Sequence, residues 1–134
     1  MPATTSTQTI FAALRYRDAA AAIDWLQRAF GFEAREVHKG SSGRVQHAEL
    51  AYGGNLIMLG EAGDGSDGRL EEDFGPQWLY VVVEDPDAHH ERAVAAGAQI
   101  VRGMRDEEYG SRGYTARDPE GNLWTIGTYR PDSS

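Results

Sequence analysis

The pattern of apolar and polar residues in the first half of the chain predicts a strand followed by a helix. A short apolar run over 10–16 ends just before Asp18, whose carboxylate can accept hydrogen bonds from the first free amide groups of a helix. Gly31 provides the left-handed residue that ends such a helix. The apolar residues at the spacing of one buried stripe are Ile23, Leu26 and Phe30. An amphipathic helix is therefore expected between Asp18 and Gly31.

Three more strands are expected after this helix. They cover residues 32–38, 45–52 and 56–59. A turn at 40–43 separates the first two, and Gly53 with Gly54 makes a tight hairpin between the last two. In the middle strand, apolar residues alternate with His47 and Glu49, so one face is apolar and the other polar. The first half is therefore predicted to be a βαβββ module.

The second half of the chain repeats this layout. The sequence GNLIMLG at 54–60 reappears as GNLWTIG at 121–127, an offset of 67 residues that is half the chain. The pairs of residues carried by the same offset are Phe11 with Trp78 and Asp18 with Asp85. Because a repeat at this period fixes the architecture, the two halves are expected to share one supersecondary structure.

In the second half, a strand over 78–83 leads to Asp85 as helix cap, with Pro86 at the first helical position and Gly97 as the stop. The strands expected after this helix cover residues 98–102, 114–117 and 123–128. The fold class predicted is α+β, with two tandem βαβββ modules.

One domain is expected over residues 1–134, with module one at about 8–60 and module two at about 77–130. The linker, 61–76, is rich in Gly, Asp and Glu and has little to bury. Its segment DGSDG at 64–68 is superficially similar to a calcium-binding loop, but the alternating oxygen ligands and the closing glutamate are absent. No calcium site is expected.

Composition narrows the range of functions. The chain has no cysteine, which excludes disulfides, thiol nucleophiles and thiolate metal sites. It begins without the basic and apolar segments of a signal peptide, and its composition is not that of a membrane protein, so a cytoplasmic location is expected. The formal net charge of −8 disfavours nucleic acid, whose phosphates an acidic surface repels, and favours a cationic or neutral partner.

Two short motifs complete the pattern: AFGF at 29–32, which closes the first helix, and DPEGN at 118–122, before the last strand. With the two modules, they resemble the vicinal oxygen chelate superfamily, which contains glyoxalases, bleomycin resistance proteins and extradiol dioxygenases. The segment YGSRGY at 109–114 resembles the bleomycin-resistance branch in particular. The resemblance covers roughly 8–129 and implies that the modules curl into a cleft of mixed sheets with the helices outside. It also implies a homodimer, which would cover sheet edges that are otherwise exposed.

Enzymes of that superfamily hold a metal ion on the first and last strand of each module. The residues at the corresponding positions in this sequence are Phe11, Met58, Trp78 and Thr125. Two aromatic rings, a thioether and a hydroxyl do not offer the nitrogen and oxygen donors of a catalytic metal site. The resemblance therefore implies a cleft without metal or other cofactor, and it puts glyoxalase, epimerase and extradiol dioxygenase activities in doubt.

The same four positions resemble cleft-facing ones and are candidates for binding an organic ligand. Trp78 with Tyr80 two residues on would form a flat surface on which planar or cationic molecules stack. The alternative is that Phe11, Met58 and Trp78 fill the core. Trp124 is assigned to the core on the alternation of its strand, and Trp25 to the first helix.

Several polar residues have two interpretations each. His47 and Glu49 could be a general base with its partner, a metal-binding pair, or a strand edge that faces water. On the glycine-flanked turn, Tyr109 and Arg112 could close over a ligand, or the arginine could pair with a nearby glutamate, Glu107 or Glu108. His89 and His90 point about 100° apart on a helix and are expected to be solvated, without function.

The first functional hypothesis is a metal-independent protein that sequesters an aromatic or cationic small molecule such as an antibiotic. The candidate ligand-binding residues are Phe11, His47, Met58, Trp78, Tyr80, Tyr109, Arg112, Tyr114 and Thr125. The second is a lyase, isomerase or dioxygenase-type enzyme with a non-standard or absent metal site. It would use His47 with Glu49 for a metal, or Tyr114, Tyr109 or His47 as an acid. The third is a structural partner protein that makes contacts through an exposed apolar patch.

Overall fold

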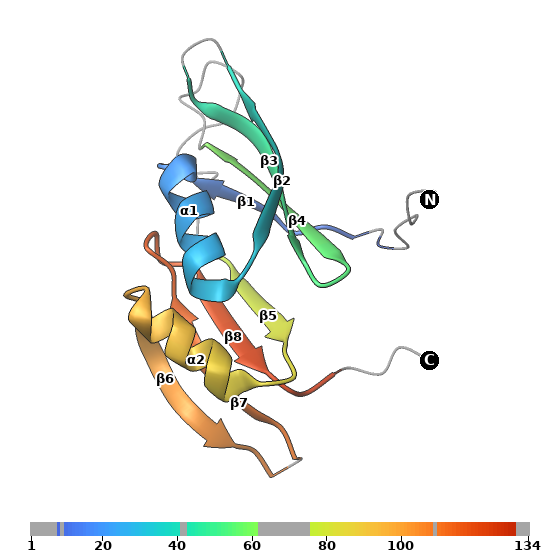
Figure 1. The fold of residues 1–134 in the computed structure, drawn as a ribbon, viewed down its shortest axis with the longest axis vertical. Helices are drawn as coiled ribbons and strands as arrows, with labels where there is room; N and C mark the ends of the chain where they lie inside the picture. Colours follow the sequence, from blue (N-terminus) through green and yellow to red (C-terminus); the bar gives the residue numbers. More distant parts are fainter. Residues whose placement is uncertain (1–7, 9, 41–42, 62–75, 109, 131–134) are drawn as a thin grey trace. The chain divides into compact units, whose positions relative to one another are not determined.

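The computed structural model describes residues 8, 10–40, 43–61, 76–108 and 110–130, and in these it forms two four-stranded mixed sheets, each with one helix (Figure 1). The chain divides into two compact units, residues 1–27 with 31–75, and residues 28–30 with 76–134. Several predicted features lie outside the described residues. They are residues 62–75 of the linker, which include the DGSDG segment, residues 41 and 42 of the turn at 40–43, and Tyr109. The two units are described separately below.

The first unit has the strand order β1-β4-β3-β2. Its elements are β1 (Ala13–Tyr16), α1 (Ala19–Phe30), β2 (Glu33–Lys39), β3 (Val45–Tyr52) and β4 (Asn55–Glu61), the last three residues of α1 grouping with the second unit. Strand β1 runs parallel to β4, and the other neighbours are antiparallel. This is the βαβββ order that the sequence predicts.

Helix α1 begins and ends where its sequence indicates. The side chain of Asp18 accepts a hydrogen bond from the amide of Ala21 at 3.1 Å. Gly31 adopts a left-handed conformation with φ of 80°, and its amide bonds back to the carbonyl of Gln27 at 3.2 Å. The residues of the predicted stripe are all buried: Ile23, Leu26 and Phe30. Local capping chemistry and one apolar stripe are thus enough to define this helix.

The second unit repeats the topology, with the order β5-β8-β7-β6 and β5 parallel to β8. Its elements are β5 (Trp78–Val82), α2 (Pro86–Ala95), β6 (Gln99–Asp106), β7 (Arg112–Arg117) and β8 (Leu123–Gly127). Asp85 caps α2 by accepting from the amide of Ala88 at 3.0 Å, and Gly97 follows the helix with φ of 88°. Strands β6 and β7 extend beyond the expected ranges, because backbone pairing continues where apolar alternation stops.

The DPEGN motif forms a turn whose first and last side chains, Asp118 and Asn122, are buried. Asp118 is 4% exposed and accepts four hydrogen bonds. One carboxylate oxygen accepts from the amides of Glu120 and Asn122, both at 3.0 Å. The other accepts from the side-chain amide of Asn122 at 3.0 Å and from the indole of Trp124 at 3.1 Å. Trp124 is fully buried, which confirms its assignment to the core.

Helix α2 corrects the interpretation of its two histidines. His89 is only 8% exposed, because it shares a buried stripe with Pro86 and Ala93 at the spacing i, i+3, i+7. Its Nδ1 lies 2.6 Å from the hydroxyl of Tyr114 on β7, and its ring centroid lies 5.2 Å from that of Phe30. Burial lowers the pKa of His89 to about 4. The expectation of two solvated histidines was therefore wrong for His89.

Among the described residues, no helix combines the length and the apolar character needed to cross a membrane.

Candidate functional site

The second sheet has one face that packs against α2 and one that carries the candidate site. The buried residues that alternate along β7 and β8 are Tyr114, Ala116, Trp124 and Ile126. Of these, Tyr114 bonds to His89 of α2, which identifies the helix side of the sheet. Because neighbouring residues in a strand point to opposite faces, Thr115 and Thr125 belong to the other side. This second side, which we call the open face, is where the sequence-predicted residues Trp78, Tyr80 and Thr125 come together.

Tyr114 is therefore not part of this site. Its side chain is fully buried on the helix side of the sheet, and its hydroxyl is engaged with His89. The expectation that Tyr114 contacts a ligand, or acts as an acid on one, is corrected by this burial. The sequence pattern placed the residue in a strand but could not say which face it occupies, since glycine at 113 interrupts the apolar alternation.

Trp78 is the most exposed aromatic side chain of the open face, at 72%. Its indole N–H donates to the hydroxyl of Thr125 at 2.8 Å, and that hydroxyl lies 2.9 Å from the hydroxyl of Thr115. The ring is thus exposed but held in orientation by a hydrogen-bond chain across three strands. The alternative that Trp78 fills the core is wrong, because a core indole would not leave most of its surface to water.

Tyr80 lies beside the chain of hydroxyls, 39% exposed, and donates its own hydroxyl to the carbonyl of Tyr129 at 2.6 Å. A Cβ at position 127 would lie 3.0 Å from the hydroxyl of Tyr80, so Gly127 provides the space that this ring occupies. A cavity of about 60 Å³ opens next to it, and Tyr80, Arg102 and Thr125 are among its lining residues. We call Trp78 and Tyr80 the aromatic pair.

Strand β6 and the residue that follows it add charged groups that the sequence did not place at this site. Arg102 is in register with Thr115 and lines the small cavity, together with Glu107. Glu107 accepts a hydrogen bond from Nε of Arg105 at 2.7 Å and lies 3.6 Å from the guanidinium of Arg102. A register shift between positions 100 and 102 breaks the alternation of β6, so the sequence pattern could not place Arg102 on the open face.

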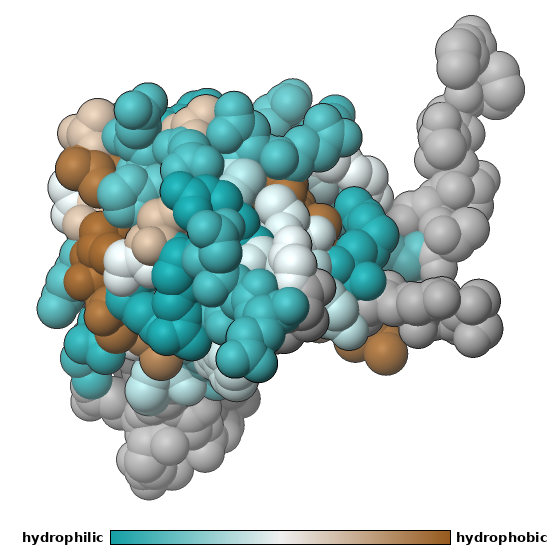
Figure 2. Space-filling model, turned by 90° about the horizontal axis from the view of Figure 1, so that it is seen from below, coloured by the Kyte–Doolittle hydropathy of each residue, from teal (hydrophilic) through white to brown (hydrophobic). Residues whose placement is uncertain are grey.

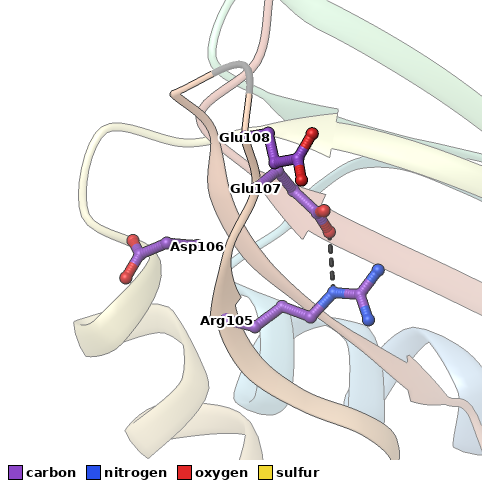
Figure 3. A pocket seen from close by; sticks show the side chains of 4 residues that line it. All are labelled: Arg105, Asp106, Glu107 and Glu108. Carbon is purple, nitrogen blue, oxygen red and sulfur yellow. Dashed lines mark hydrogen bonds and ion pairs between the residues drawn. The ribbon is translucent and has the colours of Figure 1, made fainter.

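A second, wider depression of about 390 Å³ follows the end of β6 (Figure 3). It is lined by Arg105, Asp106, Glu107 and Glu108. Figure 3 shows Glu107 turned toward Arg105, to which it is bonded, and Asp106 directed away from both. Three carboxylates around one guanidinium give this depression an acidic character that contrasts with the smaller cavity.

Arg112 has a structural role that the sequence did not indicate. Its guanidinium donates to both oxygens of Asp87 at 2.8 and 3.0 Å and to Asp106 at 3.2 Å. These contacts raise the pKa of Arg112, and its guanidinium lowers the pKa of Asp87. Neither Glu107 nor Glu108 is its partner among the described residues, so that expectation is corrected. The arginine ties β7 to the first turn of α2 and the end of β6.

The remaining described candidates belong to the first unit: Met58, His47 and Glu49 lie on its sheet, whereas Phe11 precedes β1, which begins only at Ala13 and not at residue 10 as expected. Met58 and Phe11 are half-buried, and Met58 lies in register between Ala13 and Glu49. His47 bonds to Glu49 at 2.9 Å within β3. The same pattern recurs on β2, where a histidine bonds to a glutamate at 3.0 Å. His47 and Glu49 are therefore partners of each other on a polar strand face.

The residues at the four positions where the superfamily holds metal do not fit a metal ion. The rings of Phe11 and Trp78 offer no ligand lone pair, and the hydroxyl of Thr125 is already engaged by two hydrogen bonds. Met58 is a soft thioether, which hard divalent ions bind poorly. In the part of the chain that the structure describes, no group of three or more His, Cys, Asp or Glu is arranged to hold a metal.

Two solved structures place this fold among known proteins. TioX from Micromonospora sp. ML1 is 33% identical, with a TM-score of 0.80 over 92% of this chain and 99% of that chain. Lactoylglutathione lyase from Agrobacterium tumefaciens is 20% identical, with a TM-score of 0.67 over 90% of this chain and 92% of its own. At that identity the second likeness concerns the fold alone.

Comparison of the sequence with known proteins also finds relatives of the chain. An uncharacterized protein of Mycobacterium bovis is 33% identical over 117 residues, covering 82% of this chain and 76% of its own length. An uncharacterized protein of Mycobacterium tuberculosis has the same identity over 117 residues, covering 82% of this chain and 68% of its own. The sequence profile of one superfamily matches residues 9–126. The chain, with its two tandem βαβββ modules, belongs to the Glyoxalase/Bleomycin resistance protein/Dioxygenase superfamily.

Proposed function

We propose that the chain is a cytoplasmic, metal-independent protein that sequesters a small planar or cationic aromatic compound, such as an antibiotic, on the open face of its second sheet. The observation that carries this proposal is the state of Trp78, which is 72% exposed yet fixed by a hydrogen bond to Thr125. A guest that stacks on this ring would bury apolar surface on both partners at little cost in side-chain entropy, because the ring is already oriented.

The surroundings of Trp78 support the same use. Tyr80 adds a second aromatic side chain two residues along the same strand, and the cavity beside it is bounded by hydroxyl, guanidinium and carboxylate groups. Apolar surface with a few convergent polar groups is the usual character of a small-molecule site. At low ionic strength, the net charge of −8 would in addition attract cationic guests at long range.

An enzyme of the lyase, isomerase or dioxygenase type is the second candidate. The observation in its favour is the bond of 2.9 Å between His47 and Glu49, which could orient an imidazole as a base. A structural role through a large apolar surface has less support: on the face drawn in Figure 2, hydrophilic residues predominate and hydrophobic ones form small groups.

Trp78→Leu is expected to weaken the binding of planar guests. A panel of cationic, planar and peptide antibiotics is titrated into the protein, with tryptophan fluorescence and calorimetry as readouts. Native protein should show quenching, whereas Trp78→Leu should lose the signal and about 1–3 kcal/mol of binding free energy, by analogy with base stacking. Trp25 and Trp124 are buried and should be silent.

Two controls sharpen this experiment. Trp78→Tyr keeps a flat ring and should retain most of the calorimetric affinity, which separates stacking from a general disturbance of β5. Protein treated with EDTA should bind as well as untreated protein, since no metal takes part. Equal affinity of native protein and Trp78→Leu for every guest would contradict the proposal, and binding that EDTA removes would favour the enzyme.

We also propose a homodimer, which would pair or cover end strands of the two sheets: β1 and β2 in the first, β5 and β6 in the second. Light scattering at micromolar concentration should give twice the chain mass of 14.7 kDa. A mass of one chain at every concentration would contradict this part of the proposal.

A further inference from the structure

We propose that the guest of the open face is an aromatic acid, whose ring stacks on the aromatic pair and whose anionic group binds Arg102. This inference rests on the proposed function and specifies its ligand class. The juxtaposition behind it is a cross-strand row of four residues in register, which runs over β5, β8, β7 and β6: Tyr80, Thr125, Thr115 and Arg102. Aromatic groups therefore stand at one end of the row and a guanidinium at the other.

The two ends of this row are within reach of one small molecule. Neighbouring strands lie about 4.8 Å apart, so three steps separate the end residues by about 14 Å at the backbone. The side chains converge further, because Tyr80 and Arg102 line the same cavity of about 60 Å³. Between these ends, the hydroxyl of Thr125 accepts from the indole of Trp78 and bonds to the hydroxyl of Thr115, which is itself a buried residue. A ring that stacks on the face of Trp78 therefore leaves the indole donor paired.

The far end carries a net positive charge, because two guanidinium groups share one carboxylate there. Glu107, which also lines the cavity, accepts a hydrogen bond from Arg105 at 2.7 Å and forms a longer ion pair with Arg102 at 3.6 Å. The neighbouring Asp106 is engaged by Arg112 at 3.2 Å. The side chain of Arg102 is 45% exposed, so its donors can reach a ligand. A planar guanidinium presents paired N–H groups that match a carboxylate.

Local charge outweighs the net charge of the chain in this choice. The formal charge of −8 is spread over the whole molecule, and at physiological salt exposed charges more than about 8 Å away are largely screened. A ligand anion in hydrogen-bond contact with Arg102 is far inside that distance. The site therefore favours an acidic group even though the protein as a whole is acidic.

The first module shows that this arrangement is particular to the second. The equivalent row in register runs over β1, β4, β3 and β2 and consists of Ala13, Met58, Glu49 and Glu36. Where the second sheet ends on Arg102, the first ends on a carboxylate that bonds to His38 at 3.0 Å. The duplicated sheets have thus diverged in charge at the same place, and an anionic guest fits only the second.

The test compares three ligands of nearly equal shape, 2-naphthoate, 2-naphthamide and 2-naphthylmethylammonium, by calorimetry at pH 7. Native protein should bind the naphthoate about tenfold more tightly than the amide, since charge-assisted hydrogen bonds are roughly twice as strong as neutral ones. In Arg102→Met the two affinities should become equal. Arg35→Met removes an equal charge from an exposed position on the first sheet and should keep the preference.

The outcomes separate the two proposals. If the naphthoate preference survives in Arg102→Met, or if the ammonium binds most tightly to native protein, the assignment of an acidic guest is overturned while the aromatic site stands. If none of the three ligands gives saturable binding, the proposed function itself fails and this inference falls with it. Trp78→Leu should weaken all three ligands in parallel, because stacking on the ring does not depend on the charge of the substituent.

Discussion

Asp118→Ala is expected to lower the free energy of unfolding by about 3–5 kcal/mol, the largest loss for any single carboxylate in the described structure. Asp118 is almost fully buried and accepts four hydrogen bonds, from two backbone amides, the side chain of Asn122 and the indole of Trp124. Removing the carboxylate takes an acceptor from all four donors, three of which are buried, and an unsatisfied buried donor costs about 1–3 kcal/mol. Urea denaturation followed by tryptophan fluorescence measures the effect.

Two variants test the cause of that loss. Asp118→Asn keeps the size of the side chain but turns an N–H group toward donors, so most of the loss should remain. Asp24→Ala removes an exposed carboxylate from α1 and should change stability by about 0.5 kcal/mol or less. A loss below about 1 kcal/mol for Asp118→Ala would mean that the DPEGN turn does not depend on its carboxylate.

The parts of the fold that the sequence predicted are those specified by neighbouring residues. Asp18 and Asp85 cap the two helices through amides three residues away, and Gly31 ends α1 with its own backbone conformation. The internal repeat then predicted the topology of the second half. A segment that repeats the sequence pattern of the first half is expected to repeat its order of strands and helix. Trp124 could be assigned to the core because alternation in β8 is unbroken.

The parts that the sequence did not predict depend on contacts between distant segments. Arg112 is bound by Asp87, 25 residues away, and no local pattern marks that pair. Arg102 reaches the open face only because of a register shift in β6. For His89 a signal did exist: Pro86, His89 and Ala93 share a helical face, but a histidine in such a stripe is easily taken for a surface residue.

Acidification from pH 7 to pH 4 is expected to destabilise the protein by up to about 3 kcal/mol through His89 alone. Burial against Phe30 and Tyr114 holds the pKa of His89 at about 4, whereas an unfolded histidine titrates near 6.5. Between these values the unfolded chain binds a proton that the folded protein does not. The free energy of unfolding therefore falls as the pH falls through this window, and the contribution is constant above about 6.5.

His89→Gln isolates the contribution of His89 to this pH dependence, because glutamine can bond to the hydroxyl of Tyr114 but does not titrate. The variant should be less stable than native protein at pH 7, where it has lost the packing of the imidazole ring. The difference in unfolding free energy between native protein and His89→Gln should shrink, or change sign, as the pH is lowered to 4. Only the native protein is then destabilised by the protonation of a buried imidazole. Tyr114→Phe keeps the buried imidazole and should keep the pH dependence. A difference between native protein and His89→Gln that stays constant from pH 7 to pH 4 would show that His89 is protonated as readily in the folded protein as in the unfolded chain, and that its burial has no electrostatic consequence.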